Sequence, residues 1–210
     1  MSESFFREVE PRPYDEDDHL PAFDMPAWTG PPWHRAPGVV LLDHELGRSA
    51  TTVVALESAR CFEEGVLLRL TVRVADTGRR ARQRVVEYLE RAHGRGQLDE
   101  RFAPDGLRWG VAFADGRTVT TQDESPWAGA EDILDATVAG PVLEGAGGPS
   151  VFMDTWSRDV WLWPLPPLPT LRGAVEWPAR GIEETVTSLE VSPLLEASAR
   201  CRPLWPTPPA

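Results

Sequence analysis

The sequence contains no lysine and no asparagine, so all 21 of its basic residues are arginine. The simplest account is the codon bias of a GC-rich genome, and arginine type alone therefore does not identify a phosphate or carboxylate site. Acidic residues number 33, and the net charge is −12. Because affinity for nucleic acid grows with the cations presented to the phosphates, we predict that this acidic chain does not bind nucleic acid.

Long apolar runs are also absent. No stretch approaches the roughly 18 apolar residues that a membrane-spanning helix needs. The N-terminal residues 1–6 lack the basic stretch followed by an apolar one that marks a secretory signal. We therefore expect a cytoplasmic protein without membrane contact.

Cysteine is scarce, and the usual metal-binding patterns are missing. Cys61 and Cys201 lie far apart without a CxxC partner, and in a reducing compartment we predict two free thiols. The four histidines are His19, His34, His44 and His93. They form no HxH, HExxH or Cys–His spacing typical of zinc. We predict no metal and no cofactor.

Three local patterns resemble chemical sites, and each has a simpler interpretation. The acidic run of residues 15–19 lies in a segment without periodicity, whereas a metal site needs rigid support. Residues 43–45 (Asp-His-Glu) favour a polar turn after an apolar strand, and no GxSxG elbow accompanies them. The glycine-rich residues 145–148 lack the following lysine of a P-loop. We therefore predict no catalytic residue.

Proline and glycine are abundant, at 21 and 17 residues, and predict many turns between short elements. The clearest strand is residues 66–74, where apolar and polar residues alternate strictly from Leu68 to Val74. Glu63-Glu64-Gly65 joins it to the preceding strand as a hairpin, and residues 114–117 predict another tight turn. Further strands are expected at 39–42, 51–58, 107–113, 118–121, 150–156, 159–163, 170–177 and 184–191.

Helical periodicity is confined to two stretches. Residues 81–93 carry an apolar stripe of Val85, Leu89 and Ala92, and residues 192–200 begin with Ser-Pro, a helix-start signal. Residues 79–101 are net positive and are interpreted as a solvated face; the alternative is contact with an acidic surface, such as the chain's own acidic arm. Residues 122–149 are expected to form a long loop.

These elements predict a mostly β protein. The fold expected is an antiparallel β-sandwich of two sheets with one or two short helices, and a β-barrel is the alternative. The domain spans residues 38–205, preceded by an extended acidic arm of residues 1–37 and followed by a tail of residues 206–210.

The arm is the part of the sequence that suggests a partner. It is rich in proline and carries apolar side chains that would not stay in water without reason. The residues predicted to dock on the domain or on a neighbouring chain are Phe23, Met25, Trp28 and Trp33, joined by the loop residue Trp127. We expect a protein partner, including the alternative of a homo-oligomer held by the arm.

Tryptophan is unusually frequent, with nine residues. Those in strand patterns are predicted to be core: Trp109, Trp161, Trp163 and Trp177. The alternative is a sugar-binding face, because a flat indole ring stacks on a pyranose.

The C-terminal third carries a distinctive tryptophan–proline pattern, residues 161–167 (WLWPLPP) followed by residues 176–185 (EWPARGIEET). With residues 65–74, 107–116 and 194–205, this pattern resembles a group of actinobacterial hypothetical proteins. The resemblance covers most of residues 50–205. It implies an actinobacterial source, in agreement with the arginine-only composition, and it implies no activity.

The sequence therefore favours a non-catalytic protein-binding, assembly or regulatory module. A carbohydrate- or small-ligand-binding β-sandwich is the second hypothesis. An enzyme of unrecognised type is the third, because known motifs do not exhaust catalysis.

Overall fold

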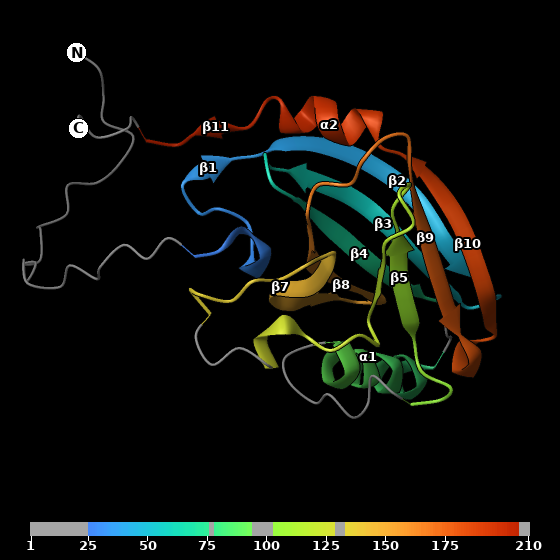
Figure 1. Ribbon diagram of the computed structural model, residues 1–210. Helices are drawn as coiled ribbons and strands as arrows, with labels where there is room; N and C mark the ends of the chain where they lie inside the picture. The colour runs from blue at the N-terminus through green and yellow to red at the C-terminus, as the bar shows by residue number, and fades with distance from the viewer. Residues whose placement is uncertain (1–24, 76–77, 94–102, 129–132, 206–210) are drawn as a thin grey trace, which may run out of the picture.

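The computed structural model describes residues 25–75, 78–93, 103–128 and 133–205. Most of the strands in this part of the chain lie in two antiparallel sheets (Figure 1). The five-stranded sheet has the order β2 (Gly38–Arg48), β3 (Thr52–Cys61), β4 (Val66–Val74), β8 (Thr155–Trp163), β7 (Val142–Phe152). The four-stranded sheet has the order β10 (Ile182–Glu190), β9 (Thr170–Trp177), β5 (Arg108–Ala112), β6 (Thr118–Thr120). A third, two-stranded sheet pairs β1 (Arg35–Ala36) with β11 (Arg202–Pro203).

The two large sheets enclose one apolar core. Alternation places Leu68, Leu70 and Val72 of β4 inside, and Val111 of β5 and Val175 of β9 face them from the other sheet. All five side chains are at most 3% exposed. The predicted antiparallel sandwich is confirmed, and so is the strand at residues 66–74.

The two sheets approach each other where edge strands β2 and β10 lie side by side. Nε2 of His44 on β2 lies 2.9 Å from Oγ1 of Thr187 on β10. No strand pairing joins β2 to β10 within the described residues, so the sheets do not close into the alternative barrel. Irregularities in the β2–β3, β3–β4, β7–β8 and β9–β10 registers bend the strands around the core.

Two helices cover the ends of the sandwich (Figure 1). Helix α1 (Arg79–His93) buries the predicted stripe of Val85, Leu89 and Ala92. Its Glu90 accepts a hydrogen bond of 3.0 Å from the indole N–H of Trp156. Helix α2 (Ser192–Ser198) buries Leu194 and Ala197 at the opposite end, as the Ser-Pro signal predicts, although Ser192 is its first residue and Val191 is the N-cap.

The predicted loop of residues 122–149 is wrong in its last part, because residues 142–149 belong to β7. Glycine weakens an isolated strand, which is why the sequence favours a loop. Here Gly145 lies beside the guanidinium of Arg158 on β8: a Cβ at Gly145 would be 2.0 Å from its Nη2. The missing side chain therefore makes room for Arg158.

The predicted polar turn at residues 43–45 is also wrong. These residues continue β2 through a break in its register with β3 between Leu41 and His44. Asp43 takes a positive φ of 44° at this point, a conformation that aspartate tolerates better than most residues. The strand therefore continues through a bulge at a position where the composition favours a turn.

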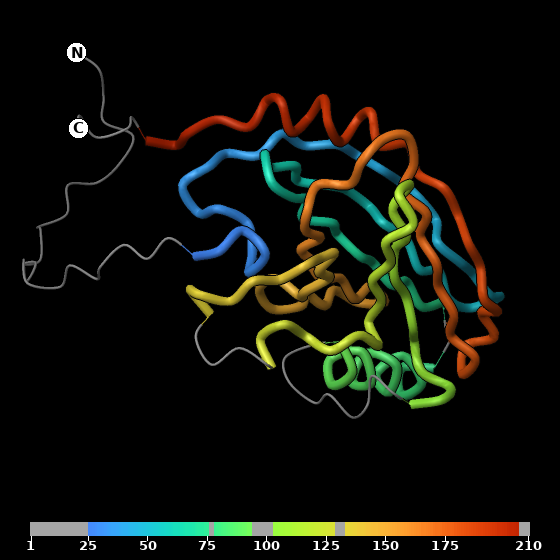
Figure 2. Tube along the Cα trace, viewed as in Figure 1, coloured from blue at the N-terminus to red at the C-terminus, as the bar shows by residue number. Residues whose placement is uncertain are grey.

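Residues 25–37 fold onto the chain's own sandwich. The short helix η1 (Ala27–Thr29) covers the outer face of the five-stranded sheet, where the backbone oxygen of Ala27 accepts a 3.0 Å hydrogen bond from the indole of Trp161. The following β1 pairs with β11, so that segments from the two ends of the chain lie side by side (Figure 2).

Three of the four tryptophans predicted to be core are buried, but one of these three lies outside the core between the sheets. Trp109 and Trp177 face the main core. Trp161 is 1% exposed on the outer face, in a separate cluster with Phe62 and Leu67, and Trp163 beside that cluster is only half-buried. The prediction of core positions is therefore confirmed for Trp109, Trp161 and Trp177, with Trp161 in the outer-face cluster, and is wrong for Trp163.

Among the described residues, no helix is long and apolar enough to cross a membrane.

Candidate binding site

A cavity of about 460 Å³ opens where the N-terminal segment meets the β3–β4 turn and the chain's C-terminal part. We call it the tryptophan cavity. Its lining comes from four separate stretches: Met25, Ala27 and residues 29–35, then Glu63 and Glu64, then Trp127, and finally Cys201. These stretches are far apart in sequence, so the cavity exists only in the folded chain.

Trp127 is the first indole of the cavity, and it packs against the buried indole of Trp28. Trp28 in η1 is 3% exposed, and its ring meets Trp127 edge to face, with centroids 5.4 Å apart. Trp127 belongs to the short helix η3 (Pro126–Ala128) and keeps 39% of its surface exposed. The indole N–H of Trp28 is buried and has no hydrogen-bond partner among the described residues. The contact with Trp28 therefore holds Trp127 at the cavity.

The second indole of the cavity is Trp33, which is 67% exposed. It packs against Trp205, at 5.8 Å between ring centroids, and against His34 at 5.6 Å. The backbone N–H of Leu204 donates a 2.9 Å hydrogen bond to the oxygen of His34, next to the β1–β11 pair. Backbone pairing thus fixes the segment that carries Trp33, while most of its ring remains open to a ligand.

The polar part of the lining is the β3–β4 turn. Glu63 forms an ion pair of 3.2 Å with Arg35, and Glu64 is also exposed. Gly65 completes the turn, and a Cβ at this position would lie 2.6 Å from the Trp161 ring. The turn therefore presents two carboxylates, and β1 one guanidinium, beside the two indoles.

The structure brings together three of the five predicted docking residues. Met25, Trp33 and Trp127 all line the tryptophan cavity. Trp28 is not available to a partner, because it is buried in its own chain. Phe23 lies outside the described residues.

Sequence reasoning missed the polar lining. The motif Glu63-Glu64-Gly65 correctly predicts a hairpin turn, since the N–H of Phe62 bonds the oxygen of Gly65 at 2.9 Å. Nothing in that motif shows that the turn faces residues 29–35, because the approach depends on packing of η1 over Trp161. His34 and Cys201 join the lining for the same reason.

The histidine and cysteine side chains that a catalytic site could use, His93 and Cys61, lie in buried structural positions. His93 is 7% exposed, and its Nε2 lies 3.1 Å from the backbone oxygen of Leu107. Burial raises the pKa of the Cys61 thiol to about 11, against a smaller opposing effect of Arg200, so Cys61 is a poor nucleophile near neutral pH. Within the described part of the chain, no three His, Cys, Asp or Glu residues are grouped as metal ligands.

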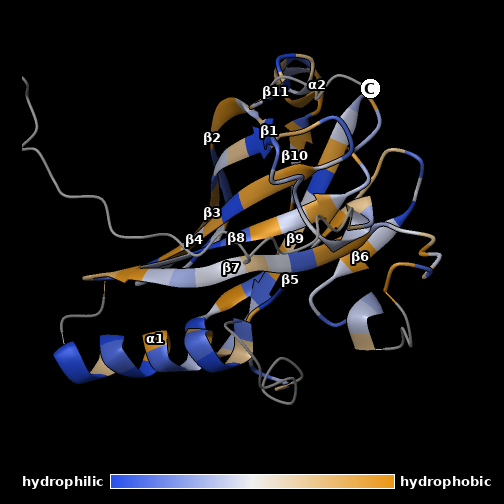
Figure 3. Ribbon diagram, turned by 90° about the vertical axis from the view of Figure 1, so that its left-hand side faces the viewer, coloured by the Kyte–Doolittle hydropathy of each residue, from blue (hydrophilic) through white to orange (hydrophobic). Residues whose placement is uncertain are grey.

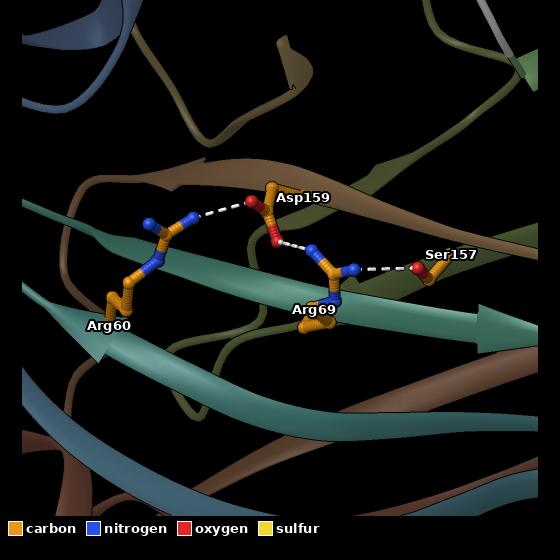
Figure 4. Close-up of polar contacts among 4 residues, drawn as sticks. All are labelled: Arg60, Arg69, Ser157 and Asp159. Carbon is orange, nitrogen blue, oxygen red and sulfur yellow. Dashed lines mark hydrogen bonds and ion pairs between the residues drawn. The ribbon is translucent and has the colours of Figure 1, made fainter. Parts of the chain in front are cut away.

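A second polar group lies on the outer face of the five-stranded sheet (Figure 4). Asp159 on β8 bridges Arg60 of β3 and Arg69 of β4, the latter at 3.1 Å, and Arg69 also donates to Ser157 at 2.7 Å. The Arg69–Asp159 pair joins directly opposite residues, as cross-strand pairs do. These contacts tie three strands together, and we assign them a structural role.

The described chain is thus a sandwich-like antiparallel β protein with an aromatic cavity at the junction of its terminal segments. Comparisons with models of protein families, with curated proteins and with solved structures found no match. The resemblance to actinobacterial hypothetical proteins stays a prediction.

Proposed function

We propose that this protein is a non-catalytic binding module and that the tryptophan cavity holds a proline-containing segment of a protein partner with a basic side chain. One observation carries the proposal: two partly exposed indoles, Trp33 and Trp127, line the same cavity. Exposed tryptophans held together by the fold are typical of interaction sites, where they supply large contact areas at low entropic cost.

The indoles favour proline in the partner. Proline-rich segments are already extended, so little conformational entropy is lost on binding, and their rings dock on aromatic surfaces. Trp127 is supported from below by Trp28, and Trp33 from the side by Trp205. Because these supports limit movement of both rings, the cavity is largely preorganised for such a segment.

The carboxylates favour a positive charge. Glu63 is partly neutralised by Arg35, whereas Glu64 adds a further negative charge at the cavity. A guanidinium or ammonium group can pair with a carboxylate and lie over an indole face at the same time. At low salt the net charge of −12 also attracts such a partner, and this long-range attraction weakens as salt is raised.

A labelled peptide of alternating proline and arginine tests this proposal by fluorescence anisotropy. We expect the full-length protein to bind it more tightly than the same peptide with glutamate for arginine. Trp127→Ala and Trp33→Ala should each weaken binding about tenfold or more, as for aromatic hot spots. Glu63→Gln with Glu64→Gln should reduce the preference for arginine.

Phe152→Ala is the matched control, because Phe152 is also a largely exposed aromatic residue but does not line the cavity. It should bind like the wild type. Binding that is equally strong in the control and in both tryptophan variants would show that the peptide uses another surface.

A small ligand such as a sugar is the second candidate function. The cavity volume of about 460 Å³ lies within the usual range of small-molecule sites. Indole faces beside carboxylates and His34 can stack on a sugar ring and bond its hydroxyls. Screening oligosaccharides against the same variants separates the two: saturable, Trp127-dependent sugar binding without peptide binding would favour this second function.

A further inference from the structure

The β7–β8 hairpin ends in three consecutive exposed apolar side chains. Val151, Phe152 and Met153 are 47%, 71% and 80% exposed. The other two hairpin turns named above are polar, at residues 63–65 and 114–117. We name residues 151–153 the apolar tip. Turn formation does not explain its apolar composition, and exposed apolar patches of this kind are typical of interaction sites.

The backbone conformation of the apolar tip does not suit its residues either. Phe152 pairs with Thr155, so that Met153 and Asp154 form a two-residue turn, and Met153 has a φ of 53°. A positive φ at this position favours glycine, because a side chain is strained there. A methionine is therefore a poor choice for folding, and its side chain reaches solvent.

The start of helix α1, which lies beside the apolar tip, also departs from the residue preferences of its position. The first turn of α1 holds Arg79 and Arg80 and no acid, although the positive end of the helix dipole favours acidic residues there. Arg79 and Arg82 line a groove of about 670 Å³ together with Val151 and Met153 of the tip. The hydropathy-coloured view shows the β7–β8 end and the start of α1 at the same end of the molecule (Figure 3).

We propose that this end of the molecule binds the surface of an anionic lipid membrane. The apolar tip enters the headgroup layer, and Arg79 and Arg80 contact lipid phosphates. A projecting apolar tip needs no complementary pocket in a fluid interface, and neighbouring cations add attraction to anionic headgroups. This contact is at the membrane surface, requires no membrane-spanning helix and is independent of the tryptophan cavity. It replaces the expectation from the sequence of a protein without membrane contact.

The charge of the rest of the chain does not prevent such a contact. Charges more than about 8 Å from the surface are largely screened at physiological salt. Asp154 and Glu87 also line the groove and oppose the approach of anions. We therefore expect reversible binding that weakens as salt is raised.

Co-sedimentation of the full-length protein with lipid vesicles tests the proposal. We expect sedimentation with vesicles of phosphatidylglycerol and phosphatidylcholine in equal parts, and little with phosphatidylcholine alone. The double variant Phe152→Ser/Met153→Ser should lose about tenfold or more in vesicle affinity. Arg79→Gln/Arg80→Gln should remove the preference for the anionic lipid.

Leu41→Ser is the control for exposed apolar residues in general, since Leu41 on β2 is 84% exposed and does not line the groove. All the substituted residues are exposed, so melting curves should show that each variant remains folded. Failure of the wild type to sediment with the anionic vesicles, or equal sedimentation of the tip variant and the wild type, would overturn the proposal.

Discussion

At the scale of the residue, side-chain alternation decides which positions are buried. Strand β4 is the clearest case, because Leu68, Leu70 and Val72 enter the core while Arg69 and Arg73 take part in ion pairs on the other face. The same alternation places Cys61 inside, at 0% exposed. A thiol in that position is a packing group, and its pKa reflects the apolar surroundings.

Cys61 leads to a prediction on pH dependence. Its pKa rises from 9.0 to about 11 on folding because burial disfavours the thiolate. Its contribution to stability is complete below pH 9, and it is lost as the pH rises towards 11, because the unfolded chain then releases the proton first. We expect the unfolding free energy of the wild type to fall by roughly 2 kcal/mol more than that of Cys61→Ala across this window.

Urea unfolding in a Cys201→Ala background, which leaves one thiol, measures this difference. Parallel pH profiles of the two proteins would contradict the prediction.

At the scale of the element, packing overrides local preference in several places. Strand β7 contains Gly145, Gly147 and Gly148 yet pairs with β8 on both sides of an irregularity between Ala146 and Ser150. At Gly145 the guanidinium of Arg158 occupies the space where a Cβ would lie. Helix α2 packs near the start of β2, where Gly38 comes close to the backbone of Ala197. Glycine is required at that contact.

Gly38→Ala tests the contact between β2 and α2. A Cβ at Gly38 would lie 1.9 Å from the backbone oxygen of Ala197 and 2.6 Å from its carbonyl carbon. Since backbone cannot rotate away as a side chain can, α2 must move, and we expect a loss of about 1–3 kcal/mol in unfolding free energy.

The matched control is Gly148→Ala, also in a strand, where an added Cβ meets no atom within 4 Å. It should change stability by less than about 0.5 kcal/mol. Equal denaturation midpoints for the two variants would show that α2 adjusts without cost.

At the scale of the whole molecule, the terminal segments decide where the candidate site lies. Residues 25–37 cover the outer face of the five-stranded sheet and pair with β11. This part of the predicted arm therefore docks on its own chain. Association between copies, as predicted for the arm, then depends on residues 1–24, which carry Phe5, Phe6 and Tyr14 among acids.

We predict that the full-length chain associates and that a chain beginning at Met25 is monomeric. The shorter chain keeps Trp28 and β1, so its melting temperature should stay close to that of the full-length protein. Light scattering measures the two masses. If both chains are monomers, residues 1–24 do not mediate association, whereas the peptide test of the tryptophan cavity is unaffected.

The sequence by itself determined the β-sandwich class, most strand positions, the two helices and two hairpin turns, because alternation, helical periodicity and turn residues act over a few neighbours. It also pointed to Met25, Trp33 and Trp127 as exposed aromatic or apolar residues outside the regular strands. Only the tertiary structure decided that these three share a cavity with Glu63 and Glu64, and that Trp28 is buried. The reason is physical: η1 lies where Trp161 offers an apolar surface and a hydrogen-bond donor, and this contact joins residues more than a hundred positions apart, beyond the range of any local pattern.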